Sequence, residues 1–265
     1  MGIIEVVKKG FVVATKNLNL VLILIVFNVI GNLVSLPFTP VQGTQPSPEM
    51  SAPLLIFTVV FVLISIFIQG GTLGSVRDYV KEGKMKLSAF ASYGAKYYLK
   101  LLLLGIVIVA VVVIVALIAA LIIAVTAPLN NKLVTIIATI IAMIIGIIAT
   151  LLYFIPLTLS PYALVCDEIG VIEAVKKSLK VAKNPFKRVF TLLLLFIVLM
   201  LISIGIVLVI GYVLNLLIAL LPSGAGRVAT AVVTGIINGY LGVVMTVSFT
   251  AYYLMLTSKQ GASAQ

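Results

Sequence analysis

The sequence predicts an all-α integral membrane protein with six transmembrane helices, interfacial amphipathic helices on the cytoplasmic side and a parallel internal repeat. Hydrophobic residues make up 63% of the chain and charged residues 9%, whereas soluble domains carry about 25% charged residues. Six apolar stretches are long enough to cross a hydrocarbon core, which takes about 20 helical residues. Two Lys-rich amphipathic segments, residues 3–16 and 170–184, each precede a pair of these stretches.

The chain is predicted to form a single transmembrane domain over residues 1–265. Short polar or Pro-rich segments separate the apolar stretches, and the fifth is long enough to tilt or to extend past the membrane. The predicted spans are residues 18–36, 53–75, 99–125, 133–160, 189–220 and 228–256.

Residues 170–184 have the pattern of a basic amphipathic helix. Ile172, Val175 and Leu179 recur at helical spacing, which places them on one face with Ala182 and Phe186. Lysines fall on the opposite side, so we expect the helix to lie in the membrane interface with its apolar face down. Asn184-Pro185 then predicts a break before the fifth span, because Asn caps helices and Pro suits their first position.

The N-terminal segment repeats this pattern. Residues 3–14 read IIEVVKKGFVVA and residues 171–182 read VIEAVKKSLKVA. A long apolar stretch follows each copy, so we interpret the similarity as an internal repeat. The alternative is a chance likeness of two Lys-rich helices. Both copies enter the membrane from the same side, so the repeat is parallel, unlike the inverted repeats of many carriers.

The basic residues set the orientation. Lys132 and Arg227 flank the spans on one side, and the other side carries three Lys near the N-terminus, six Lys and Arg in residues 77–100, six in residues 176–188, and Lys259. Because basic residues concentrate on the cytoplasmic side, we expect a multi-pass plasma-membrane protein with both termini in the cytoplasm.

Residues 69–100 are expected to form a cytoplasmic connection. The Gly-rich run 69–74 is predicted to be a flexible helix end, because it lacks the Gly-Lys-Ser/Thr of a phosphate loop. Gly83 is predicted to end the second helix and Ser88 to cap the helix that carries Phe90. The tyrosines of that helix, Tyr93, Tyr97 and Tyr98, suit an interfacial belt.

The composition excludes several function classes. The chain has no His, which removes the usual metal ligand and general base. The span interiors carry no ionisable residue, and such residues mark proton and ion paths. We therefore expect no cofactor, no metal and no catalytic residue, and we do not expect an enzyme. The net charge of +11 follows from topology, so no nucleic-acid partner is expected.

Three groups of polar or small residues need separate interpretations. Cys166, Asp167 and Glu168 point apart on a helix, and the ordinary role of the two acids is to complement the start of the 170–184 helix. Gly235 and Gly239 form a close-packing face, either inside the bundle or between subunits of a homo-oligomer. The span amides are expected to bond across helices or to a neighbouring backbone, or alternatively to line a solute cavity; they are Asn28, Asn32, Asn215 and Asn238.

The basic residues of the two amphipathic segments are the clearest functional candidates. Each Lys or Arg near an anionic leaflet contributes about 1 kcal/mol to membrane attraction. We call this set the basic collar and expect it to contact anionic lipid headgroups, although it could serve only to fix topology and anchor the helices. It comprises Lys8, Lys9, Lys176, Lys177, Lys180, Lys183, Lys187 and Arg188.

The run SPYALVCDEIGVIEAVKKSL at residues 160–179, together with six spans and the Gly-Gly near the end of the second, resembles a broad group of six-span prokaryotic membrane proteins. This group includes the membrane domain attached to some glycerophosphodiester phosphodiesterases. The stretch from Asp167 to Leu179 carries the resemblance best. The chain has no soluble phosphodiesterase domain, so the resemblance implies neither hydrolase activity nor any catalytic residue.

We therefore expect a non-enzymatic membrane scaffold or lipid-interacting module whose partners are membrane lipids. One alternative is an uncoupled channel or carrier for a small or lipidic solute, which a cavity lined by the four amides would favour. A second is a lipid-modifying enzyme, which clustering of Asp78, Asp167 and Glu168 would favour.

Overall fold

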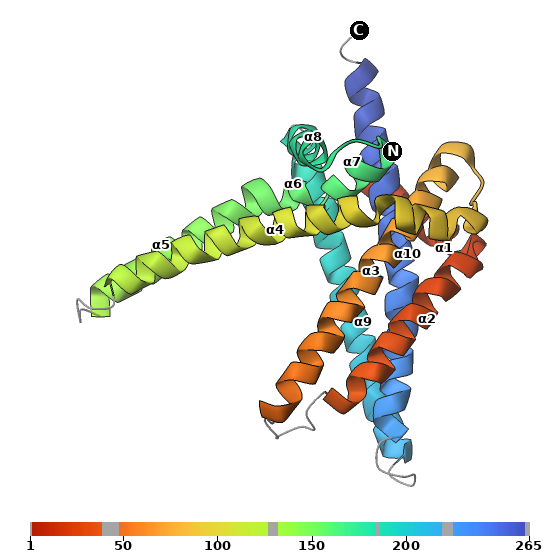
Figure 1. The fold of residues 1–265 in the computed structure, drawn as a ribbon, viewed down its shortest axis with the longest axis horizontal. Coiled ribbons are helices and arrows are strands. Elements are labelled where there is room, and N and C mark those ends of the chain that lie inside the picture. The colour runs from red at the N-terminus through yellow and green to blue at the C-terminus, as the bar shows by residue number, and fades with distance from the viewer. Residues whose placement is uncertain (1, 39–47, 127–131, 184–185, 219–224, 263–265) are drawn as a thin grey trace. The chain divides into compact units, whose positions relative to one another are not determined.

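The computed structural model describes residues 2–38, 48–126, 132–183, 186–218 and 225–262, and every regular element in these ranges is helical (Figure 1). Within them, six helical segments are long and apolar enough to cross a membrane. The all-α class and the six predicted spans are confirmed, and the chain is a multi-pass membrane protein. The segments are Leu18–Phe38, Ala52–Glu82, Leu87–Thr126, Lys132–Cys166, Phe186–Val213 and Ala225–Ser258.

Several helices are longer than the spans predicted from the sequence. The second, fifth and sixth spans lie in α3, α9 and α10, which run to 35, 33 and 38 residues. The elements are α1 (Ile3–Lys16), α2 (Leu18–Ser35), η1 (Leu36–Phe38), α3 (Pro48–Glu82), η2 (Leu87–Ala89), α4 (Phe90–Thr126), α5 (Lys132–Ala149), the π-helical η4 (Thr150–Phe154), α6 (Ile155–Leu157), α7 (Ser160–Cys166), α8 (Val171–Lys183), α9 (Phe186–Ile218) and α10 (Ala225–Ala262).

The helices divide into two compact units, which we describe separately. Unit 1 contains residues 1–98 and 191–255, and unit 2 contains residues 99–190 and 256–265. The predicted break at Asn184-Pro185 lies outside the described residues, between the end of α8 and the start of α9.

In unit 1, small residues of α10 allow α2 to pack closely against it. A Cβ built on Gly235 would lie 2.6 Å from Cγ2 of Val29, and one on Gly239 would lie 2.6 Å from Cα of Ile25. Close backbone approach through small residues is a common way to join membrane helices. The Gly235/Gly239 face therefore packs inside the chain, the first of the two predicted alternatives, and α2 covers the surface proposed for a homo-oligomer.

The Gly-rich run 69–74 is not a flexible helix end, because it lies inside α3 and Gly70 to Val76 are all buried. A Cβ on Gly71 would lie 2.7 Å from the ring of Phe90, and one on Gly70 would lie 3.3 Å from the carbonyl oxygen of Gly94. These glycines thus bring α3 against the start of α4. The sequence reveals the glycines but not their partner helix, which only tertiary packing determines.

Two predictions concern the ends of helices at residues 83–98. Gly83 follows α3 with φ of +74°, as predicted for a residue after a helix end. The helix expected after Ser88 is present, but it begins at Phe90 and runs unbroken through the third span to Thr126, and Ser88 itself lies inside η2. No Gly or Pro separates the two predicted parts between residues 95 and 104, so nothing interrupts the helix there.

In unit 2, the fourth span changes character halfway along. Residues Leu133 to Phe154 are mostly exposed, whereas Ile155 to Cys166 are mostly buried. The change follows the π-helical turn, which ends at Phe154, two residues before Pro156. A wide turn accommodates a proline that cannot donate a backbone hydrogen bond. The buried part, α6 and α7, is the surface on which α8 packs.

Candidate functional site

The basic collar lies on two amphipathic helices, and the first of them is α1. Its buried residues include Val6, Gly10, Val13 and Ala14. Gly10 permits the approach to α10, since a Cβ there would lie 2.7 Å from the carbonyl oxygen of Val244. The opposite face carries exposed Lys8 and half-buried Lys9.

Helix α8 packs on α7 mainly through small residues. The apolar face predicted to meet the membrane comprises Ile172, Val175, Leu179, Ala182 and Phe186, whereas the residues of α8 buried inside the protein are Ala174, Ser178, Val181 and Ala182. The small residues fit against α7, where the Ser178 and Ser160 hydroxyls hydrogen-bond at 2.7 Å. Consequently Ile172 is 58% exposed, and Val175 and Leu179 are half-buried.

The two helices bury equivalent positions of the sequence repeat. Val6, Gly10, Val13 and Ala14 of α1 align with Ala174, Ser178, Val181 and Ala182 of α8, and all eight are buried. Exposed Ile4 aligns with exposed Ile172.

Their first turns also match. Glu5 accepts a hydrogen bond from the backbone N–H of Gly2 at 2.7 Å, and Glu173 accepts one from Gly170 at 3.4 Å. Both are the reciprocal half of a capping box. Glu173 therefore supplies a capping carboxylate to α8.

Most collar residues point away from the packed faces. Lys8, Lys176, Lys180, Lys183, Lys187 and Arg188 are exposed. The ammonium of Lys177 forms a 2.9 Å salt bridge with Asp167, so it is less available to a lipid headgroup than the other lysines are. The face presented by α8 therefore combines exposed lysines with the outward Ile172, the composition expected of a helix that contacts a headgroup region.

A second polar cluster joins the end of α3 to the start of α4. Arg77 donates to Asp78 at 2.9 Å and to the Tyr97 hydroxyl at 2.7 Å, and the Tyr93 hydroxyl donates a short hydrogen bond to Asp78. Asp78 is 4% exposed and Tyr97 is fully buried. These two tyrosines thus do not form the predicted interfacial belt, and Asp78 is held in a satisfied ion pair.

Charged groups near the other helix ends have ordinary roles. Lys86 forms a 2.9 Å salt bridge with Glu82, and this hydrogen bond and charge hold the pKa of Lys86 above its usual 10.5. Among the described residues, no group of three or more His, Cys, Asp or Glu side chains could hold a metal ion.

The span amides lie in three different environments. Asn28 donates to Leu24 O of its own helix at 2.8 Å, whereas Asn32 crosses to Ala231 O of α10 at 3.0 Å. Asn238 is exposed, and the side chain of Asn215 lies outside the described residues. Asn28 and Asn32 thus make the two kinds of bond predicted for such amides.

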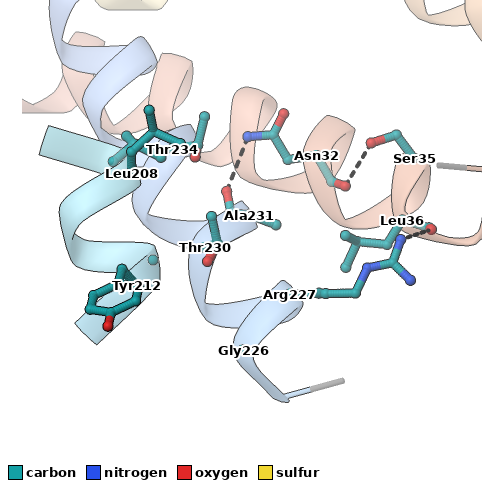
Figure 2. Close-up of a pocket in the computed structure, with 12 residues that line it drawn as sticks. Asn32, Ser35, Leu36, Leu208, Tyr212, Gly226, Arg227, Thr230, Ala231 and Thr234 are labelled. Atoms are coloured by element: carbon teal, nitrogen blue, oxygen red, sulfur yellow. Dashed lines mark hydrogen bonds between the residues drawn. The ribbon is translucent and has the colours of Figure 1, made fainter. Parts of the chain in front are cut away.

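Asn32 also lines a cavity of about 640 Å³ between the C-terminal parts of α2 and α9 and the N-terminal end of α10. Arg227 reaches across to donate to Leu36 O at 3.0 Å, and Ser35 donates to Asn32 O at 2.8 Å. Figure 2 shows Leu208 and Tyr212 of α9 on the other side of Thr230. We call this the Arg227 cavity; it is lined by Asn32, Ser35, Leu36, Val207, Leu208, Gly211, Tyr212, Gly226, Arg227, Thr230, Ala231 and Thr234.

The sequence analysis did not identify the Arg227 cavity. It named one lining residue, Asn32, as a possible cavity residue, and the other available signal was Arg227, one of only two basic residues on the side predicted to lie opposite the collar. A second cavity, of about 440 Å³, is almost wholly apolar and lies between α9 and α10 with Phe11 and Ile25 at its edge.

Comparison with known proteins gives a family but no activity. No curated protein and no solved structure matches the chain. A family model matches residues 1–256, which is nearly the whole chain and includes both amphipathic helices and all six predicted spans. The chain therefore belongs to the family described as a domain of unknown function, DUF7847.

Proposed function

We propose that this chain is a non-enzymatic, lipid-interacting module of the plasma membrane that uses the basic collar to contact anionic lipid headgroups. The observation that carries the proposal is the shared register of α1 and α8. Each buries the same four repeat positions in its own unit and leaves its lysines outward. If the outward face has a function beyond packing, both copies of the repeat are expected to keep that face outward.

The proposal includes the placement of the two helices and of the termini. We infer that α1 and α8 lie in the cytoplasmic interface, that they are equivalent parts of a parallel repeat, and that both termini are cytoplasmic. The matching first turns and burial support the repeat, and the distribution of basic residues supports the orientation.

Electrostatics favour lipid over protein as the partner of this face. Lysines close to an anionic leaflet contribute about 1 kcal/mol each, and the collar sets them beside exposed Ile4 or Ile172, which can enter the acyl boundary. The carrier and enzyme alternatives have less support, because Asn28 bonds within its own helix and Asp78 is neutralised by Arg77.

The test measures which lipids stay with the protein. The full chain is placed in nanodiscs of equal phosphatidylglycerol and phosphatidylcholine, and the lipids retained after detergent extraction are counted by native mass spectrometry. A variant with Lys8, Lys9, Lys176, Lys180 and Lys183 changed to Gln should lose most of the preference for phosphatidylglycerol.

A matched control changes the same five lysines to Arg, which keeps the charge, and should retain the preference. If the Gln variant enriches phosphatidylglycerol as strongly as the unmodified chain does, the collar is only a topology signal. Orientation is checked separately: a cysteine at Glu49 should react with an impermeant reagent from outside intact cells, and one at Lys176 should not.

A further inference from the structure

We propose that the Arg227 cavity binds the phosphate of an anionic phospholipid in the leaflet opposite the basic collar. The inference goes beyond the proposed function, since it concerns different residues at the other end of the spans. It rests on the position of the cavity, its charge, its hydroxyl groups and its open side.

The cavity lies at the level where headgroups meet hydrocarbon. Leu36 and Arg227 are within two residues of the ends of the apolar segments Leu18–Phe38 and Ala225–Ser258. The Asn32–Ala231 and Arg227–Leu36 hydrogen bonds hold these two helix ends together, as Figure 2 shows. A ligand here would have its polar part at the boundary and its chains toward the membrane interior.

The charge of the described lining favours an anion. Arg227 is its one charged residue, and no acidic side chain is among the lining residues that the structure describes. The cavity also includes the first turn of α10, where the helix dipole is positive. Arg is well suited to phosphate because its planar guanidinium can donate two parallel hydrogen bonds.

Within the part of the chain that the structure describes, two threonines of the cavity differ from other threonines in that their hydroxyl groups are not bonded to their own helix. Thr72, Thr139, Thr246 and Thr250 each donate to the carbonyl four residues earlier in their helices. In the described residues, the hydroxyls of Thr230 and Thr234 make no hydrogen bond. Both line the cavity one turn apart, on the same wall as Arg227, so they can donate to phosphate or headgroup oxygens.

The remaining wall suits the apolar part of a lipid. Leu208 is 68% exposed and Tyr212 is 67% exposed, so the cavity opens at the side of the helix bundle, where a lipid could enter from the bilayer. Its volume of about 640 Å³ falls within the range of about 300–1,000 Å³ that is usual for ligand sites. A headgroup with the first part of its chains fits this combination better than a small soluble ion does.

The experiment isolates this cavity from the collar. The chain carrying the five collar Lys→Gln changes is purified in detergent, mixed with phosphatidylglycerol and phosphatidylcholine of identical chains, and analysed by native mass spectrometry. We expect a preference for phosphatidylglycerol that Arg227→Gln lowers about tenfold, as expected for the loss of a charged hydrogen bond. Arg227→Lys should keep most of it.

The threonines provide a matched pair of variants. Thr230→Val with Thr234→Val should lower retention of phosphatidylglycerol, whereas Thr246→Val with Thr250→Val, on the same helix but away from the cavity, should not. Thermal unfolding shows whether each variant remains folded.

Two results would overturn the assignment. One is equal retention of phosphatidylglycerol by folded Arg227→Gln and by the unmodified cavity. The other is binding of glycerol phosphate or inorganic phosphate that Arg227→Gln abolishes while lipid retention is unaffected, which would identify a soluble phosphate compound as the ligand. Because the comparison is made with and without Arg227 in one background, in which five of the eight collar residues are already neutral, failure here leaves the proposed function untouched.

Discussion

Helices α1 and α8 present the same side to the rest of the protein but are attached by different physical means. At the central repeat position, Gly10 lets α1 approach the backbone of α10, whereas Ser178 forms a buried hydrogen bond with Ser160 of α7. One junction depends on the absence of a side chain and the other on a polar pair. A repeat can therefore preserve which face is buried while the interactions that hold it diverge.

The largest expected effect comes from filling the Gly10 junction. Gly10→Val introduces atoms where Val244 and Ser248 of α10 already lie, so α1 must shift or detach. Overpacking of this kind costs about 1–3 kcal/mol or more. The melting temperature in detergent, followed by reaction of a fluorescent maleimide with the single, buried Cys166, should fall by several degrees.

Gly205→Val is the control for that substitution. Gly205 lies on α9 with nothing within 4 Å of a built Cβ, so the added side chain meets open space. If Gly10→Val melts no earlier than Gly205→Val, then α1 is not packed on α10 as the structure shows.

A smaller effect is expected at the other junction. Ser178→Ala leaves the buried Ser160 hydroxyl without this partner, and an unsatisfied buried donor costs about 1–3 kcal/mol. Changing Ser160 and Ser178 together to Ala removes both polar groups and should restore most of the loss, which the same Cys166 melting assay measures. Additive losses in the double variant would contradict a direct pairing.

The smallest expected effect comes from weakening the caps of α1 and α8, and it should differ between the two first turns. Glu5→Gln and Glu173→Gln each weaken a cap that contributes about 0.3–1 kcal/mol. The Glu5 hydrogen bond is shorter, at 2.7 Å against 3.4 Å. Amide exchange in the first turn should therefore accelerate more in α1 than in α8, and the reverse order would mean that the two caps are not comparable.

The helices were predictable because each depends on a local pattern. Hydropathy located six spans, and the 3.6-residue period located α1 and α8. Which face of α8 is buried was not predictable in the same way. Ile172 and Leu179 are more apolar than Ala174 and Ser178, but α7 offers a close surface that only small side chains fit. Packing between membrane helices favours small residues, so hydrophobicity alone does not identify the face of α8 that packs on α7.

The two candidate sites also differ in how far the sequence predicts them. The exposed lysines of the collar could be listed from the sequence, because long charged side chains seldom lie buried. The Arg227 cavity could not, because Asn32, Tyr212 and Thr230 come from three helices far apart in the chain. For the same reason, a sequence reading could not show that Asp78 is matched by Arg77 and Tyr93.

The π-helical turn at Thr150–Phe154 has a consequence for sequence change in this family. Each residue of an α-helix advances the side chains by about 100°, so the wide turn sets the angular phase of all that follows it in the fourth span. A π-turn holds one residue more than an α-turn, so the loss of one residue there can restore an even α-helix and leave Ser160 facing Ser178. We therefore expect the fourth span to tolerate a one-residue deletion within Thr150–Phe154 better than one between that turn and Ser160, which would rotate Ser160 away from Ser178.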